Sequence, residues 1–273
     1  YGQFIWSGDK WRLNGGVRWD SNSLYGEQTS PRVAVIYHYS PSLTYKLIYG
    51  EAFQEPAPVN LYGGWNGRLN NAGLKPETVA NIEFITQYQT ENWLHDVSIY
   101  HASYSNVIAD ASNVGERHVD GVEYRGQYRW KNPISTAKSI TGNLYYTYTR
   151  SVADKQYANQ SSEWVDGTDD TGDIAPHKIS WHLNWPLSAD WNLNLVTNWV
   201  SKKRLFSQNP LRADSSSGRT TDTRTASYTT TDVTIRYDRQ YYDVGLKIEN
   251  LFEEAYFSPG PEGASSGDEF TVD

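Results

Sequence analysis

The feature that most constrains this chain is a double alternation. Apolar and polar residues alternate along short segments, and the links that join those segments alternate between short and long. In residues 122–130, Val122 and Tyr124 fall on one face of an extended chain, while Glu123 and Arg125 fall on the other. Successive side chains of a strand point to opposite faces, so this period of two predicts β-strands with one apolar and one polar face. Twelve strands are predicted, at residues 1–7, 11–20, 31–39, 43–53, 77–89, 94–105, 118–130, 138–150, 177–186, 191–201, 226–238 and 241–250.

The links between these predicted strands sort by length. Every odd-numbered link is short, as at 239–240, and the even-numbered links are longer. Three of the longer links, at about 54–76, 151–176 and 202–225, each exceed 20 residues. The tail 251–273 is rich in Gly, Pro and Ser and is predicted to be a further long loop. Short turns at one end and long loops at the other are typical of an up-and-down β-barrel in an outer membrane.

Strand length and composition favour the same fold. Most predicted strands run about 10 residues, the length that a tilted transmembrane strand needs, and about twice the average for soluble proteins. The chain is polar, with a mean hydropathy of −0.69, and it lacks an apolar run long enough for a membrane helix. Its 11 Trp and 21 Tyr suit the aromatic girdles of a membrane barrel. We therefore predict an all-β, antiparallel up-and-down transmembrane β-barrel.

Two other all-β folds are compatible with part of this pattern. A soluble antiparallel sandwich also alternates, but its strands would be shorter and its links would not sort by length so regularly. A self-closed barrel of twelve strands is also possible, because twelve is an even number. It would have a backbone diameter of roughly 24 Å, much of which inward side chains would fill.

Charge and residue usage exclude some functions. The net charge of −8 disfavours nucleic-acid binding, and the absence of Cys excludes disulfide and thiol chemistry. There is also no Met, and the chain begins within a predicted strand, so we expect it not to start at a natural translation start.

Several stretches resemble the TonB-dependent outer-membrane receptors. Each stretch is weak alone, but their shared order over most of the chain is specific. The stretches are Pro31-Arg32-Val33-Ala34, Lys46 to Pro56 (reading KLIYGEAFQEP), Leu74-Lys75-Pro76-Glu77-Thr78, Asn81-Ile82-Glu83, Gly121-Val122-Glu123, Ala175-Pro176-His177-Lys178, and Asn250-Leu251-Phe252 with Tyr256.

This resemblance implies a fold and a location. The whole of residues 1–273 would be a single, incomplete domain, about twelve strands of a 22-stranded barrel in the outer membrane of a Gram-negative bacterium. The amino-terminal plug and the final strand would be absent, and the short links would face the periplasm. Twenty-two strands would enclose roughly 44 Å, enough for a folded plug.

The resemblance also implies a function, namely TonB-dependent active transport of a large scarce nutrient, most often a ferric siderophore. The implied partners are the cargo, the TonB–ExbB–ExbD system acting through the plug, and outer-membrane lipid and lipopolysaccharide. No enzyme activity, cofactor or nucleic acid is expected. The alternatives are a passive porin or channel, an outer-membrane hydrolase and a soluble β-sandwich binding module.

Candidate binding residues lie in the long loops and on the polar faces of the strands. Aromatic side chains stack on flat ligands and Arg pairs with anionic ones, so the loop candidates are Trp65, Asn66, Arg68, Trp164, Arg204, Phe206 and Arg212. The same residues could instead shape the loops or contact lipopolysaccharide. The candidates for lumen-facing residues are Arg18, Lys46, Glu83, Glu123, Arg125, Lys178, Arg236, Lys247 and Glu249. In a receptor these residues would bind the plug or line the transport path, and in a β-sandwich they would form the solvent-exposed face.

Catalytic and metal sites have little support in the sequence. Ser180 and His182 share a polar strand face, but no base and nucleophile can be argued to be oriented for catalysis. No metal site is assigned. Asp166, Asp169, Asp170 and Asp173 are weak calcium candidates in an acidic, Gly-containing run whose spacing does not match an EF-hand, and a solvated loop is the favoured interpretation.

Overall fold

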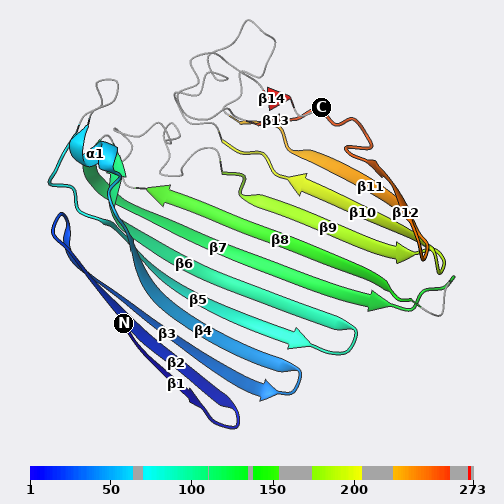
Figure 1. The fold of residues 1–273 in the computed structure, drawn as a ribbon, viewed down its shortest axis with the longest axis horizontal. Coiled ribbons are helices and arrows are strands. Elements are labelled where there is room, and N and C mark those ends of the chain that lie inside the picture. The colour runs from blue at the N-terminus through cyan, green and yellow to red at the C-terminus, as the bar shows by residue number, and fades with distance from the viewer. Residues whose placement is uncertain are drawn as a thin grey trace, which may run out of the picture.

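A computed structural model describes residues 1–63, 70–109, 111–134, 138–153, 174–204, 224–258 and 270–271. Twelve antiparallel strands form one sheet in which each strand pairs with its neighbours in the chain (Figure 1). The strands are β1 (Gly2–Ser7), β2 (Trp11–Asn22), β3 (Gly26–Ser40), β4 (Leu43–Gln54), β5 (Glu77–Gln89), β6 (Trp93–Ala109), β7 (Ser112–Trp130), β8 (Ile140–Ala153), β9 (His177–Pro186), β10 (Trp191–Val200), β11 (Tyr228–Asp238) and β12 (Asp243–Ile248). The predicted strands and their antiparallel order are confirmed.

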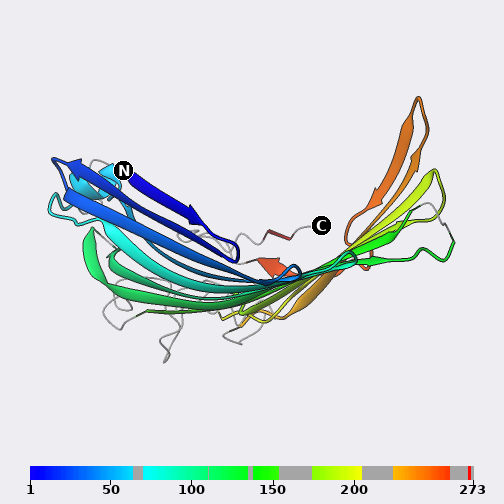
Figure 2. The same ribbon diagram turned by 90° about the horizontal axis from the view of Figure 1, so that it is seen from below.

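The sheet is strongly curved but open. Seen along the sheet, it bends into a trough whose two edges, β1 and β12, stand apart (Figure 2). No pairing joins β1 to β12, so the described strands do not close on themselves as a twelve-stranded barrel would. In the described part of the chain, no helix is long and apolar enough to span a membrane.

Two of the links expected to be long are short. The link predicted at 21–30 is a tight turn at 23–25. Most of the link predicted at 106–117 belongs to the strands, because β6 continues to Ala109 and β7 begins at Ser112. Their pairing is irregular here, with register shifts after Tyr104, and Gly115 adopts a φ of 145° that disfavours other residues. Polar residues on both faces of this extension hide the alternation on which the sequence interpretation depends.

Two small elements were not predicted. A short helix, α1 (Pro58–Tyr62), lies in the link after β4, and its first residue is a proline, which suits the first turn of a helix. In the tail, which was expected to be a loop, β13 (Phe257–Ser258) pairs with β14 (Phe270–Thr271).

One face of the sheet is apolar and exposed. Residues paired directly across neighbouring strands point to the same face. The register of β4 to β8 therefore places a row of five apolar or aromatic residues on a single face. These residues are Leu47, Phe84, Ile99, Val122 and Tyr148. Ile99 is 54% exposed and Leu47 is 45% exposed. An apolar surface of this extent is costly in water and suits contact with lipid, whereas in a sandwich a second sheet would cover it.

Aromatic side chains border this apolar face at the end of the sheet that carries the short turns. Trp11 stacks on Tyr37 with ring centroids 4.3 Å apart, and Trp191 lies 4.7 Å from Tyr237. The short turns themselves close tightly, as where the backbone N–H of Thr90 donates to the carbonyl of Trp93 at 2.7 Å. Aromatic rings at a strand end suit the interface between lipid and water.

Candidate binding surfaces

The second face of the sheet is polar, and it carries the residues predicted to face a lumen. One cross-strand row on this face contains three of them, because Lys46 pairs with Ile85, Ser98 with Glu123 and Thr147 with Lys178, and these pairs continue one another. By the same register, Arg18, Glu83, Arg125, Arg236 and Lys247 share this face, and Glu249 follows it just past the end of β12. Whether this face lines a lumen remains a prediction.

Hydrogen bonds and ion pairs orient several of these groups. Arg125 on β7 pairs with Asp96 on β6 at 2.9 Å, and Glu83 accepts a hydrogen bond from the Ser98 hydroxyl. Other pairs are local, such as Arg18 with Asp20 at 2.7 Å. The charged side chains of both ion pairs keep partial access to solvent, so each ion pair contributes little to stability and mainly fixes side-chain direction.

A tyrosine crosses this polar face above a glycine. Gly121 pairs with Tyr100, and a Cβ atom on Gly121 would lie 2.1 Å from the Tyr100 Cζ atom. The missing side chain therefore lets the Tyr100 ring lie across β7 toward β8, where its hydroxyl is 3.4 Å from the Thr149 hydroxyl. This glycine is required by the close approach of the ring rather than by its backbone angle.

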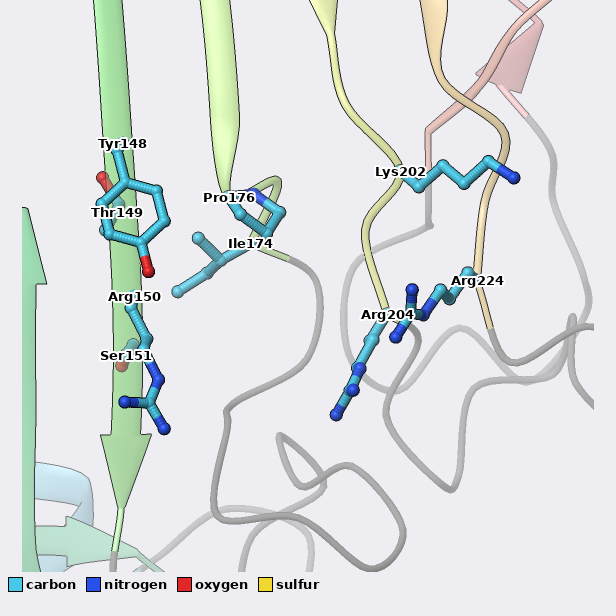
Figure 3. A pocket seen from close by; sticks show the side chains of 9 residues that line it. All are labelled: Tyr148, Thr149, Arg150, Ser151, Ile174, Pro176, Lys202, Arg204 and Arg224. Carbon is cyan, nitrogen blue, oxygen red and sulfur yellow. The ribbon is translucent and has the colours of Figure 1, made fainter.

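A basic cleft of about 240 Å³ lies at the end of the sheet that carries the long links (Figure 3). The cleft lies where the end of β8 separates from β9. The residues just before β9 and just after β10 form its other sides. Its lining residues are Tyr148, Thr149, Arg150, Ser151, Ile174, Pro176, Lys202, Arg204 and Arg224. Among these described lining residues four are basic and none is acidic, which suits an anionic ligand.

Arg204 is the loop candidate that the structure places in this cleft. It forms an isolated β-bridge with Arg224, and the two side chains lie next to each other in Figure 3. The other loop candidates (Trp65, Asn66, Arg68, Trp164, Phe206 and Arg212) lie outside the described residues, as do the calcium candidates Asp166, Asp169, Asp170 and Asp173. Their roles stay predictions.

A hydrogen bond outside the strands connects the tight turn after β2 with the long link after β4. The Tyr25 hydroxyl, in the turn between β2 and β3, donates to the Glu55 carboxylate that follows β4. This hydrogen bond to the carboxylate raises the pKa of Tyr25 above its ordinary value of 10.0, because it favours the protonated phenol.

The one Ser–His pair found in the sequence forms a contact without an acid. Ser180 Oγ lies 2.8 Å from His182 Nε2, but the serine hydroxyl is also 2.7 Å from the amide oxygen of Asn198. Within the described part of the chain, no group of three or more His, Cys, Asp or Glu residues could hold a metal ion.

A more extended network, missed from the sequence, spans β6 and β7 on the apolar face. His101 Nδ1 lies 2.7 Å from Asp120 Oδ1, and His101 Nε2 lies 3.0 Å from Ser103 Oγ, which in turn is 3.2 Å from His118 Nδ1. The order resembles a nucleophile with its base. However, the backbone N–H groups of these central strands are hydrogen-bonded to the neighbouring strands of the sheet. They are therefore not available as an oxyanion hole, which a hydrolase needs. We interpret it as a polar network.

Comparison with known proteins identifies the family. The family model described as TonB dependent receptor-like, beta-barrel, matches residues 1–251. The vitamin B12 transporter of Vibrio cholerae is 31% identical over 132 residues, covering 44% of this chain and 20% of the transporter. The ferric enterobactin receptor of Pseudomonas aeruginosa is 23% identical over 280 residues, covering 91% of this chain and 36% of the receptor.

Solved structures agree on the fold. The ferric-catecholate import receptor Fiu of Escherichia coli K12 superposes with a TM-score of 0.71 at 15% identity, covering 92% of this chain and 39% of the receptor. A variant of the P. aeruginosa ferric enterobactin receptor in complex with enterobactin gives 0.72 at 17% identity, covering 97% and 41%. This chain thus spans about a fifth to two fifths of these relatives' lengths.

The apolar and polar faces of one up-and-down sheet are what an outer-membrane barrel requires, and transport receptors of this kind are not enzymes. With the family model matching residues 1–251, the chain belongs to the TonB-dependent receptors and forms part of their outer-membrane β-barrel.

Proposed function

We propose that the protein containing this chain imports a large, scarce nutrient, a ferric siderophore, across the outer membrane by TonB-dependent active transport. The observation that carries this proposal is the polar row across the sheet, opposite an exposed apolar face. The kinship with ferric enterobactin receptors supports a siderophore, and the basic cleft supports an anionic one.

The spacing of the polar row supports a binding role rather than a structural one. Lys46 on β4 and Glu123 on β7 are three strands apart, or about 14 Å, and Glu123 and Lys178 are two strands apart, or about 10 Å. Charges at these distances do not pair with one another, because an ion pair needs about 4 Å. They are arranged to meet groups that enter the lumen, which we assign to the plug and the cargo.

In this mechanism the chain does no covalent chemistry. Cargo enters from the long-link end, where Arg204 and the other loop candidates would hold it. TonB, driven through ExbB and ExbD, then pulls on a plug that is bound to the polar face. Movement of the plug opens a path along the lumen-facing charges. These charges exchange plug groups for cargo groups as partners, so the free-energy cost of each step of the movement stays low.

An uptake assay tests this function. The receptor that contains this chain would be expressed in a Gram-negative strain lacking other siderophore receptors, and labelled ferric siderophore uptake would be followed with and without TonB. We expect accumulation that is lost without TonB, reduced by Lys178→Met on the polar face and unchanged by Lys10→Met in a short turn. Uptake that persists without TonB, together with steady conductance in planar bilayers, would indicate a passive channel and contradict the proposal.

A further inference from the structure

On the described strands β8, β9 and β10, one strip of the polar face contains no Asp, Glu, Lys or Arg. It consists of the polar-face positions of these strands between Lys178 and the short turns, and we call it the neutral strip. On β10 it extends from Asn198 to Asn192, which is about 20 Å along the strand. Side-chain amides lie on all three of its strands, at Asn143, Asn184, Asn192, Asn194 and Asn198.

Charged residues flank the neutral strip on both sides. Arg125 and Arg129 of β7 lie on the polar face next to β8. Asp232 and Arg236 of β11 lie on the same face next to β10. In the proposed function the plug binds the charges of this face, so it is held at the flanking strands more firmly than at the strip between them. The neutral strip is therefore the part of this wall from which a moving plug separates most easily.

Hydrogen bonds between side chains orient the polar groups of the neutral strip. Asn184 Nδ2 donates to the side-chain oxygen of Asn194 at 2.7 Å and to that of Asn192 at 3.2 Å. The Ser180 hydroxyl donates to the side-chain oxygen of Asn198 at 2.7 Å. Within the described residues, the side-chain N–H groups of Asn194 and Asn198 have no protein acceptor. The strip therefore offers neutral donors to the oxygen atoms of a ligand.

The neutral strip and the basic cleft share three strands. β8, β9 and β10 are neighbours in the sheet (Figure 1), and the cleft lies at their long-link ends. Pro176 lines the cleft, and Lys178 follows it two residues later on β9. An anion that moves along β9 from the cleft therefore passes Lys178 and then meets the neutral groups of the strip. Charge-assisted hydrogen bonds are roughly twice as strong as neutral ones, so the strip should hold an anion less firmly than the cleft does.

We propose that the neutral strip is the exit surface of the receptor, the section of the wall along which anionic cargo leaves for the periplasm. Its amide and hydroxyl groups form weak, uncharged hydrogen bonds with oxygen atoms of the cargo, so the cargo is guided but not retained. Lys178 is the last lysine or arginine that the cargo meets on β9. This role rests on the proposed function, because only a transported cargo passes along the wall.

A cation placed on the neutral strip should trap anionic cargo there. Asn198→Lys places one on β10, where the cross-strand neighbours Ser180 and Thr230 are uncharged. Thr44→Lys is the matched control, because Thr44 lies in the same cross-strand row on β4, outside the strip. Both residues are half-buried, and each has one side-chain contact: Asn198 lies 2.7 Å from Ser180 Oγ, and Thr44 lies 3.1 Å from His38 Nδ1.

Uptake of radiolabelled ferric enterobactin, measured against its concentration in a strain with TonB, tests the trap. Asn198→Lys should lower the maximal rate about tenfold, the effect expected when a neutral hydrogen bond becomes charge-assisted. The half-saturating concentration should not change, because capture at the cleft is unaltered. Thr44→Lys should leave both values unchanged.

Binding of ferric enterobactin to cells without TonB shows whether each variant has assembled. If Asn198→Lys has not, Asn194→Lys places the cation four residues further along the strip. An unchanged maximal rate in the variant with a cation on the strip, or an equal loss in Thr44→Lys, would overturn the exit surface.

A bulky, uncharged substitution separates the exit surface from the proposed function. Asn198→Trp narrows the path whatever the charge of the cargo, and Thr44→Trp is again the control. Uptake of vitamin B12 instead of ferric enterobactin would contradict the siderophore function, but Asn198→Trp should still slow that uptake while Thr44→Trp should not. If Asn198→Trp imported the accepted cargo at the unaltered rate, the exit surface would be wrong even with the proposed function intact.

Discussion

The assignment of the two faces makes a quantitative prediction at neighbouring positions of β10. Trp191, Leu195 and Trp199 lie on the apolar face, whereas Val196 lies on the polar face opposite Asp232. The two tryptophans are eight residues apart, which corresponds to about 21 Å along the membrane normal for a tilted strand, close to the height of about 25 Å of a barrel's apolar band. Leu195 is midway between them, so it should lie near the middle of the bilayer.

The perturbation is the same chemical change on each face, Leu195→Arg and Val196→Arg. Arginine at the midplane on the lipid side costs about 2–4 kcal/mol, and at Leu195 this should appear in full as a lower free energy of unfolding. Arginine at Val196 points into the polar side, beside a carboxylate, and should change that free energy by less than about 1 kcal/mol.

Reversible folding into lipid vesicles, titrated with urea and followed by tryptophan fluorescence, measures both variants. A difference of about 3 kcal/mol corresponds to a change of more than a hundredfold in the folding equilibrium constant. If Leu195→Arg and Val196→Arg were equally tolerated, or if Val196→Arg were the more damaging, the apolar face would not meet lipid and our argument about the faces would be wrong.

Two further predictions concern local contacts. Gly121→Val should lower the free energy of unfolding by roughly 1–3 kcal/mol, because the new side chain would displace the Tyr100 ring. This loss of stability should be smaller in a Tyr100→Ala background, where the ring is absent. Equal losses in both backgrounds, measured by urea titration, would contradict this reasoning. The hydrogen bond to Glu55 raises the pKa of Tyr25, so the stability it contributes is complete below pH 10.0 and is lost as the pH rises through the folded-state pKa. In an ultraviolet titration, Tyr25→Phe should reduce the late-ionising absorbance by one tyrosine, while Tyr62→Phe should leave that late-ionising absorbance unchanged.

The division of each strand into two faces was predictable from the sequence. Alternation is a local property, because the direction of a side chain follows from its place in the pleat and not from the partner strand. Lys46, Glu123 and Lys178 could therefore be assigned to one face without knowing that they would lie in one row. The long, regular spacing of the strands likewise indicated their order.

Strand ends and turns were predicted less well. Near Gly115 the chain is polar on both faces, so periodicity could not distinguish an extended hairpin from a loop. The helix α1 has only five residues, fewer than two turns, which is too short for a periodic signal.

The binding surfaces depended on register, which is a long-range property. His101 and Asp120 are 19 residues apart and meet only because β6 and β7 pair in one particular alignment. The basic cleft requires Arg150, Arg204 and Arg224 to come together from the ends of three strands. A slip of one residue in any pairing would place these side chains on the opposite face. The sequence by itself thus determined which residues of a strand share a face, while only the tertiary structure decided which residues of different strands are neighbours, because cross-strand partners are chosen by the packing of the whole sheet.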